Sequence, residues 1–251
     1  MTEIIIHKKS EELARAGAGM ILTWAKEAVA EKGFFLSAIS GGSTPRPLHR
    51  LFKEEPYLSE MPWSAFHLFW VDERCVRAED PDSNYGTAKK DFLDRIPIPK
   101  HQIHPMRGDV RPDKGTEQYQ KELETFFHSR GKIDPVFDLI LLGIGTDGHT
   151  ASLFPGHGAL NNTKKWVVAV KGGRPNVFRI TLTLPILNAA QHVIILASGK
   201  EKAQIVEKIF HDKGAILPAQ RIQPVHGDLI WLMDEEAASA LMNDTPLQID
   251  E

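Results

Sequence analysis

The sequence predicts an α/β fold in which helices cover both faces of a mostly parallel sheet. Short apolar runs that suit buried strands alternate along the chain with segments of helical period. Several of these runs end in glycine-rich or polar clusters, as parallel strands do where their carboxyl ends form a ligand site. The length of 251 residues, without an evident linker or repeat, favours a single domain over residues 1–251.

The first helix is marked at both ends by its sequence. Ser10 suits the N-cap, Glu11 and Glu12 follow in the first turn, and Gly33 suits the left-handed position after the last turn. Between these ends, apolar residues recur at helical spacing, which indicates a face packed on the core.

The remaining elements continue the alternation. We expect strands at 34–39, 65–71, 137–142, 179–184, 193–197 and 229–233, and helices at 113–130, at 200–210 and from residue 235. Another helix follows the first of these strands, where Thr44 can cap it and Pro45 can take its first position. The polar stretch at 97–115 is expected to be a surface loop.

The composition excludes several classes of protein. The formal charge is −3, hydrophobic residues make up 42% of the chain and charged residues 25%. This balance argues against disorder and against a general binder of nucleic acid or of anionic membranes. No apolar run approaches the roughly 18 residues of a membrane span, and the N-terminus does not resemble a signal peptide. Cys75 is the single cysteine, so no internal disulfide is possible, and we expect a cytoplasmic protein.

The first polar cluster is the segment Ser-Gly-Gly-Ser-Thr-Pro at 40–45, which follows a predicted strand. Glycines let backbone N–H groups approach an anion closely. The segment lacks the Gly-Lys-Ser/Thr sequence of a P-loop. Phosphate binding and an ordinary strand-to-helix turn therefore both stay open.

The second cluster, Asp72-Glu73-Arg74, ends an aromatic strand. Arg74 could steady an oxyanion, because a guanidinium stays charged and offers several donors. The alternative is a solvated strand end with a local ion pair. The neighbouring Cys75 lacks any sequence signature of an activating base, and we interpret it as a bystander.

The third cluster begins at Gly143, and with Gly145 and Gly148 it formally matches a dinucleotide-binding fingerprint. That fingerprint needs an acidic residue about 20 positions later. No Asp or Glu occurs between Gly148 and Lys200, so a nicotinamide cofactor is not expected. The same stretch carries six Lys and Arg residues, which favours an anionic substrate, with a solvated face as the alternative.

His149 follows Gly148 on this glycine-rich segment, where binding groups concentrate. Imidazole is suited to proton transfer near neutral pH, so we weigh a general-base role against a structural one. The other ten histidines show no spacing of paired metal ligands, and no metal is expected. A catalytic serine is not expected either, because Ser152 lies outside any Gly-x-Ser-x-Gly motif.

In chain order, these motifs together resemble the 6-phosphogluconolactonase family. The resemblance runs from about residue 34 to residue 231 and rests on the segments 40–45, 71–74 with 80–85, 145–156, 179–183 and 198–203. It implies a Rossmann-like α/β sheet similar to that of glucosamine-6-phosphate deaminase. It also implies hydrolysis of 6-phosphoglucono-δ-lactone to 6-phosphogluconate in the oxidative pentose phosphate pathway, without a required cofactor.

The resemblance also implies roles for individual residues. His149 would take a proton from water that attacks the lactone carbonyl, and Arg74 would face the oxyanion. Asp147 or Asp72 would orient His149 or bind sugar hydroxyls, and the sequence does not decide between them.

The phosphate of the substrate would be held by backbone N–H groups and two cations. The residues that the resemblance implies for this role are Gly41, Gly42, Ser43, Thr44, Arg179 and Lys202. Lys171 and Arg174 either share this role or merely line the entrance.

Two alternatives stay open at this point. A glucosamine-6-phosphate deaminase shares the Gly-x-Asp-Gly-His motif, but Phe154 stands here in place of that enzyme's glutamate, and phenylalanine cannot transfer a proton. A sugar-phosphate-binding protein that lost catalysis would keep the same cleft. The expected partner is a phosphosugar lactone, with no nucleic acid or membrane, and the sequence leaves the oligomeric state undetermined.

Overall fold

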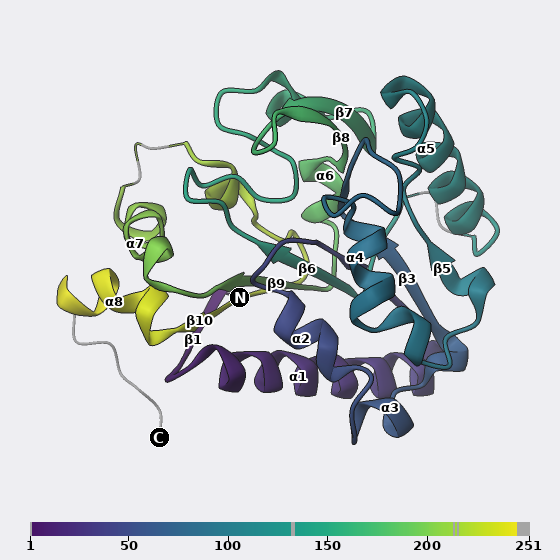
Figure 1. Ribbon diagram of the computed structural model, residues 1–251, viewed down its shortest axis with the longest axis horizontal. Coiled ribbons are helices and arrows are strands. Elements are labelled where there is room, and N and C mark those ends of the chain that lie inside the picture. The colour runs from purple at the N-terminus through teal and green to yellow at the C-terminus, as the bar shows by residue number, and fades with distance from the viewer. Residues whose placement is uncertain (1, 132–133, 213, 215, 245–251) are drawn as a thin grey trace.

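The computed structural model describes residues 2–131, 134–212, 214 and 216–244. Its centre is a seven-stranded sheet in which all neighbouring strands are parallel (Figure 1). The strand order is β1 (Thr2–His7), β10 (Asp228–Asp234), β9 (His192–Ala197), β6 (Leu139–Gly143), β2 (Phe35–Ile39), β3 (Phe66–Trp70) and β5 (Ile103–His104). The predicted α/β class with a mostly parallel sheet is therefore confirmed.

A second, three-stranded sheet departs from the expectation for the segment 179–184. It has the order β4 (Asp72–Arg74), β8 (Val177–Leu182) and β7 (Val167–Gly172), and both pairs are antiparallel. The segment does form a strand, but this strand does not join the parallel sheet. The chain reverses between β7 and β8 at Gly173, whose φ of 81° suits a glycine, and β8 then pairs with both neighbours.

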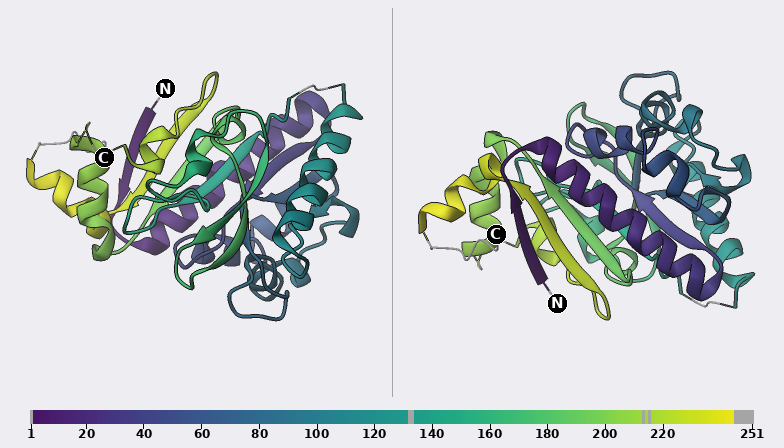
Figure 2. Two further views of the ribbon diagram at one scale, coloured as in Figure 1. Left: turned by 90° about the horizontal axis from the view of Figure 1, so that it is seen from above. Right: turned by 90° about the horizontal axis from the view of Figure 1, so that it is seen from below.

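Helices lie on both sides of the parallel sheet. They are α1 (Ser10–Lys32), α2 (Arg46–Leu51), α3 (Tyr57–Glu60), α4 (Asn84–Asp91), α5 (Pro112–His128), α6 (Leu184–Leu187), α7 (Ala203–His211) and α8 (Glu235–Asp244). Figures 1 and 2 show α1 across one face, with α5 and the small sheet over the other. Within the described residues, none of the helices combines the length and the apolar character needed to cross a membrane.

Two helix starts differ by one residue from those expected. Lys9 is the capping residue of α1 and Ser10 is its first helical residue, because the Lys9 carbonyl already accepts two helical N–H bonds. Helix α2 begins at Arg46, and Pro45 precedes it without any side-chain cap from Thr44. The expected end of α1 is confirmed, since Gly33 has a φ of 86°.

Several short elements were missed or misplaced. The stretch 97–115 is not only a loop, because it contains β5 and the first residues of α5. The expected helix at 200–210 begins as a 3-10 turn at Lys200–Lys202 before α7 starts. Strands β1 and β7 and helix α4 were not expected; β1 and β7 each lie at the edge of a sheet and pair with a single strand.

The order of strands reverses between β2 and β6. From β2 the chain builds outward through β3 and β5, and it then returns to place β6 on the other side of β2 before adding β9 and β10. Such a reversal leaves a crevice at the carboxyl ends of the two central strands. Ser40 ties these ends together, because its hydroxyl donates to the Leu141 carbonyl at 2.9 Å.

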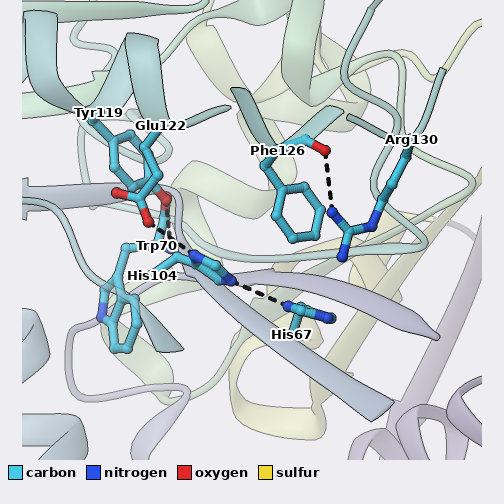
Figure 3. A network of polar contacts seen from close by, with 7 residues as sticks. All are labelled: His67, Trp70, His104, Tyr119, Glu122, Phe126 and Arg130. Atoms are coloured by element: carbon cyan, nitrogen blue, oxygen red, sulfur yellow. Dashed lines mark hydrogen bonds and ion pairs between the residues drawn. The ribbon is translucent and has the colours of Figure 1, made fainter. Parts of the chain in front are cut away.

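A network of polar contacts connects β3 and β5 with α5 (Figure 3). The Tyr119 hydroxyl donates to the Trp70 carbonyl and accepts from the Trp70 N–H, both at 3.0 Å. Nearby, His104 contacts His67 at 3.2 Å and Glu122 at 2.8 Å. Burial is the main cause that lowers the pKa of His67 to about 4. These contacts fix the carboxyl end of β3, where the second polar cluster begins.

We expect Tyr119→Phe to lower the free energy of unfolding by about 1–3 kcal/mol, because two backbone groups of Trp70 lose a buried partner. Urea unfolding followed by tryptophan fluorescence measures this. Tyr57→Phe is the matched control, since it removes the same atom from a single 3.2 Å bond to the Arg15 carbonyl. Equal losses in the two variants would contradict the special role of Tyr119.

Candidate functional site

A cleft opens at the carboxyl edge of the parallel sheet, over the point where the strand order reverses. Its walls come from the loops after β2 and β6, from the small sheet, and from the turn after β9. All predicted site residues except Asp147 line it, namely Gly41, Gly42, Ser43, Thr44, Asp72, Arg74, His149, Arg179 and Lys202. The structure thus brings together residues that lie far apart in the sequence.

The loop after β2 needs its two glycines for different reasons. A Cβ on Gly41 would lie 1.9 Å from the side-chain oxygen of Asn84, so a larger residue would push the two segments apart. Gly42 has a φ of 95°, which residues with a side chain rarely adopt. The loop therefore keeps a tight path along the cleft, with its backbone exposed to a ligand.

Asp72 is buried and links three parts of the site. One carboxylate oxygen accepts from the Ser152 hydroxyl at 2.5 Å, and the other accepts from the side-chain amide of Asn84 at 3.2 Å. Ser152 is fully buried and its hydroxyl donates to this carboxylate, so it has no access to a substrate. These bonds connect β4, the loop after β6 and the start of α4.

His149 is oriented by Asp147, which stands two residues before it. The Nδ1 atom of His149 lies 2.5 Å from a carboxylate oxygen of Asp147. A carboxylate can only accept, so Nδ1 carries a proton, and in the neutral imidazole Nε2 is then the nitrogen with the free lone pair. The hydrogen bond to His149 is the largest influence that lowers the pKa of Asp147, to about 2.

The tight turn around His149 requires Gly145. A Cβ on Gly145 would lie 2.0 Å from Nδ1 of His149 and 2.6 Å from the Asp147 carboxylate. The Gly145 N–H also donates to the His149 carbonyl at 2.8 Å, which closes the turn. Thus the glycine pattern that resembles a dinucleotide fingerprint serves here to make room for a histidine–aspartate pair.

The lining of the cleft carries more positive than negative charge. Arg74 and Arg179 face each other in the register of β4 and β8. The Arg179 guanidinium donates to the Gly172 carbonyl at 3.1 Å, and burial followed by the charge of Arg74 lowers its pKa. Among the described residues that line the cleft, three are Lys or Arg and one, Asp72, is acidic. This imbalance suits an anionic ligand.

Phe154 lies beside the pair formed by His149 and Asp147. Its ring centroid is 4.9 Å from that of His149, and the Arg179 guanidinium lies 5.7 Å from the same ring. Asp147, Phe154 and Lys171 line an adjoining hollow rather than the cleft itself. The carbonyl of Arg174 accepts from Arg179 at 3.4 Å.

Asn84 is a cleft residue that sequence reasoning missed. Its side-chain amide donates to the Asp72 carbonyl at 2.9 Å, and its side chain packs against Gly41. A signal for its position existed, because Ser83 is a good N-cap and its hydroxyl accepts from the Gly86 N–H at 3.0 Å. Cys75, by contrast, has its pKa raised to about 11 by burial, which keeps the thiol protonated at neutral pH.

Known proteins resemble this chain over most of its length. The model of the family described as "Glucosamine-6-phosphate isomerases/6-phosphogluconolactonase" matches residues 8–231. The 6-phosphogluconolactonase of Synechocystis sp. is 40% identical over 225 residues, which are 88% of this chain and 90% of that protein. A probable chloroplastic 6-phosphogluconolactonase of Oryza sativa subsp. japonica is 38% identical over 248 residues, or 95% of this chain and 76% of that protein.

Solved structures show the same arrangement of elements. The 6-phosphogluconolactonase of Trypanosoma brucei superposes with a TM-score of 0.82 at 29% identity, covering 96% of this chain and 99% of that one. A monomeric glucosamine-6-phosphate deaminase superposes with a TM-score of 0.73 at 23% identity, covering 95% and 99%. The second likeness shows a shared fold, as the sequence resemblance implied.

In His149→Ala, we expect the pKa of Asp147 to rise from about 2 toward the ordinary value of about 3.9. The folded-state value lies below that of the unfolded chain, so the pair stabilises the fold above about pH 4 and loses this effect as the pH falls toward 2. Carboxyl ¹³C NMR titration measures the change. Asp109, which is paired with Arg107 at the surface, serves as the internal control. An unchanged pKa of Asp147 would show that His149 is not its main partner.

Proposed function

Because this chain belongs to the glucosamine-6-phosphate isomerase/6-phosphogluconolactonase family, we propose that it hydrolyses 6-phosphoglucono-δ-lactone to 6-phosphogluconate, a step of the pentose phosphate pathway. One observation carries the proposal beyond family membership. A histidine oriented by a carboxylate lines the same cleft as two guanidinium groups and an ammonium group. Hydrolysis of an anionic ester needs this combination of a base and positive charge.

In the proposed reaction, His149 acts twice. Its Nε2 takes a proton from a water molecule as the water oxygen attacks the lactone carbonyl carbon, which gives a tetrahedral oxyanion facing Arg74. The bond between this carbon and the ring oxygen then breaks, and His149 returns the proton to the ring oxygen. The carboxylate of Asp147 stabilises the imidazolium between the two transfers, because it accepts from Nδ1 throughout.

The phosphate group is proposed to bind to the cations and the glycine loop that line the cleft. Arg179 and Lys202 supply positive charge there, and the Gly41–Thr44 loop supplies backbone N–H groups. Arg179 is held by backbone carbonyls rather than by a carboxylate, so its charge stays available to a ligand.

Asp72 has a different task from Asp147 in this proposal. The bond to His149 comes from Asp147, whereas the Asp72 carboxylate accepts from Ser152 and Asn84. Asp72 therefore holds the walls of the cleft together, and its edge that lines the cleft can accept from a sugar hydroxyl.

Phe154 distinguishes this proposal from deamination. The ring stands beside His149, at the position where the sequence comparison placed a proton-transferring glutamate of the deaminase. A phenyl ring cannot supply the second proton transfer that ring opening of an amino sugar requires.

A cytoplasmic location is also proposed, from the single cysteine of the chain. Cell fractionation tests this location, since some relatives are named as chloroplastic.

We expect the wild-type protein to hydrolyse freshly generated lactone, and His149→Ala to lose about 10²–10⁴-fold in kcat. The assay follows 6-phosphogluconate, with spontaneous hydrolysis subtracted. His101→Ala is the control, because this histidine is exposed and lies outside the cleft lining.

Near wild-type turnover in folded His149→Ala would overturn the role of this residue as the base. A wild-type protein that leaves the lactone intact but releases ammonia from glucosamine 6-phosphate would replace the proposal with deamination. Binding of 6-phosphogluconate without any turnover would instead support a sugar-phosphate-binding protein.

Lys202→Ala is expected to raise KM for the lactone about tenfold and to weaken competitive inhibition by inorganic phosphate equally, with a smaller change in kcat. A charge-assisted hydrogen bond contributes about 1.5–3 kcal/mol to binding. Lys200→Ala is the matched control, because it removes the same charge from the exposed side of the same 3-10 turn. Equal changes in KM in the two variants would show that the overall positive potential around the cleft matters, and not a direct contact of Lys202 with the phosphate.

A further inference from the structure

Glu73 stands between two residues of the cleft lining, yet its side chain serves the opposite side of β4. Asp72 and Arg74 line the cleft, whereas Glu73 lines a separate hollow with Ser83 and Tyr85. Glu73 is only 1% exposed. A buried carboxylate without a Lys or Arg partner in hydrogen-bond contact needs a specific set of donors.

Four donors surround this carboxylate. One oxygen accepts from the backbone N–H groups of Arg74 and Asn84, both at 2.7 Å. The other accepts from the Tyr85 N–H at 2.8 Å and from the Ser83 hydroxyl at 3.1 Å. The negative charge also lies at the N-terminus of α4, where the helix dipole favours it. Glu73 thereby clamps the segment 83–85 to β4.

The clamped segment reaches back into the cleft at two points. The Asp82 carbonyl accepts from the Arg74 guanidinium at 2.7 Å, and the Asn84 side chain donates to the Asp72 carbonyl at 2.9 Å. Asp82, which supplies the acceptor, directly precedes the segment that Glu73 holds, and Asn84, which supplies the donor, lies within it. The orientation of Arg74 and Asp72 toward the cleft thus depends on a carboxylate outside it.

We propose that Glu73 is a positioning residue for the reaction, which fixes the segment 82–85 so that Arg74 faces the oxyanion. The inference rests on the proposed lactone hydrolysis. Glu73 touches no substrate and acts through Arg74 and Asn84.

The chemistry of the clamp requires a carboxylate rather than an amide. Glutamine in this place would turn an NH₂ group toward N–H or O–H donors, and at least one buried donor would lose its acceptor. Burial raises the pKa of Glu73 to about 7, while the three backbone N–H groups act against this shift. The surrounding donors favour the ionised form, and burial opposes it more strongly than the donors support it.

The test compares Glu73→Gln with Glu79→Gln, which removes the same charge from an exposed residue lining the same hollow. We expect Glu73→Gln to lower kcat about tenfold to a hundredfold through misplacement of Arg74. Inhibition by inorganic phosphate, which reports Arg179 and Lys202, should change less than threefold. Glu79→Gln should behave as wild type.

A double-mutant cycle separates positioning from general stability. If Glu73 acts through Arg74, Glu73→Gln should cost much less in an Arg74→Ala background than in the wild type. The inference would be overturned if the fold-loss of kcat in the double variant equalled the product of the losses in the two single variants. A kcat for Glu73→Gln equal to that of Glu79→Gln would overturn it as well.

Amide hydrogen exchange tests the clamp without relying on turnover. The N–H groups of Asn84 and Tyr85 should be protected in the wild type, and they should exchange faster in Glu73→Gln. Unprotected exchange of these two amides in the wild type would overturn the inference even if Glu73→Gln fails to fold. Absence of lactone hydrolysis by the wild type would instead count against the proposed function, and the exchange result would still report on the clamp.

Discussion

The geometry of the cleft depends on the two backbone hydrogen bonds of Val71, the residue at which the chain passes from the large sheet to the small one. The Val71 N–H donates to the Ile39 carbonyl of β2 at 2.9 Å, and the Val71 carbonyl accepts from the Leu182 N–H of β8 at 2.8 Å. Val71 is fully buried, so these two bonds are shielded from water. The junction carries the residues that follow it over the carboxyl edge of the parallel sheet. It also sets β8 so that Arg179 faces Arg74.

This arrangement leaves positive charge uncompensated within the site. Two guanidinium groups on paired strands repel each other, and the nearest carboxylates are engaged elsewhere. Asp72 accepts from Ser152 and Asn84, and Glu73 accepts mainly from backbone N–H groups. The acidic residues beside the cleft therefore organise its walls instead of neutralising its cations. A ligand with two negative charges therefore meets a cleft lining in which three cationic side chains outnumber one carboxylate, that of Asp72.

Local patterns in the sequence predict much of this site, whereas long-range pairing escapes them. The glycine loops and strand ends are contiguous, so their places at the carboxyl edge follow from the α/β alternation. The pairing of β8 with β4 joins segments about a hundred residues apart, and no local pattern contains it. The choice of Asp147 over Asp72 as the partner of His149 depends partly on contacts that no local pattern contains, because the Asp72 carboxylate is engaged by the distant Ser152. Glu73 has two acidic or basic neighbours and looks like part of an exposed charged cluster, although it is buried.

The histidine–aspartate pair and the cations Arg179 and Lys202 belong to different parts of the fold. His149 and Asp147 sit within one tight turn after β6, so their mutual geometry is set locally by Gly145. Arg179 and Lys202 come from β8 and from the turn after β9. Phe154 lies against His149 and excludes a second proton-transferring side chain at that point. In the proposed hydrolysis a single base serves both proton transfers, because the proton taken from water is the one that the ring oxygen needs.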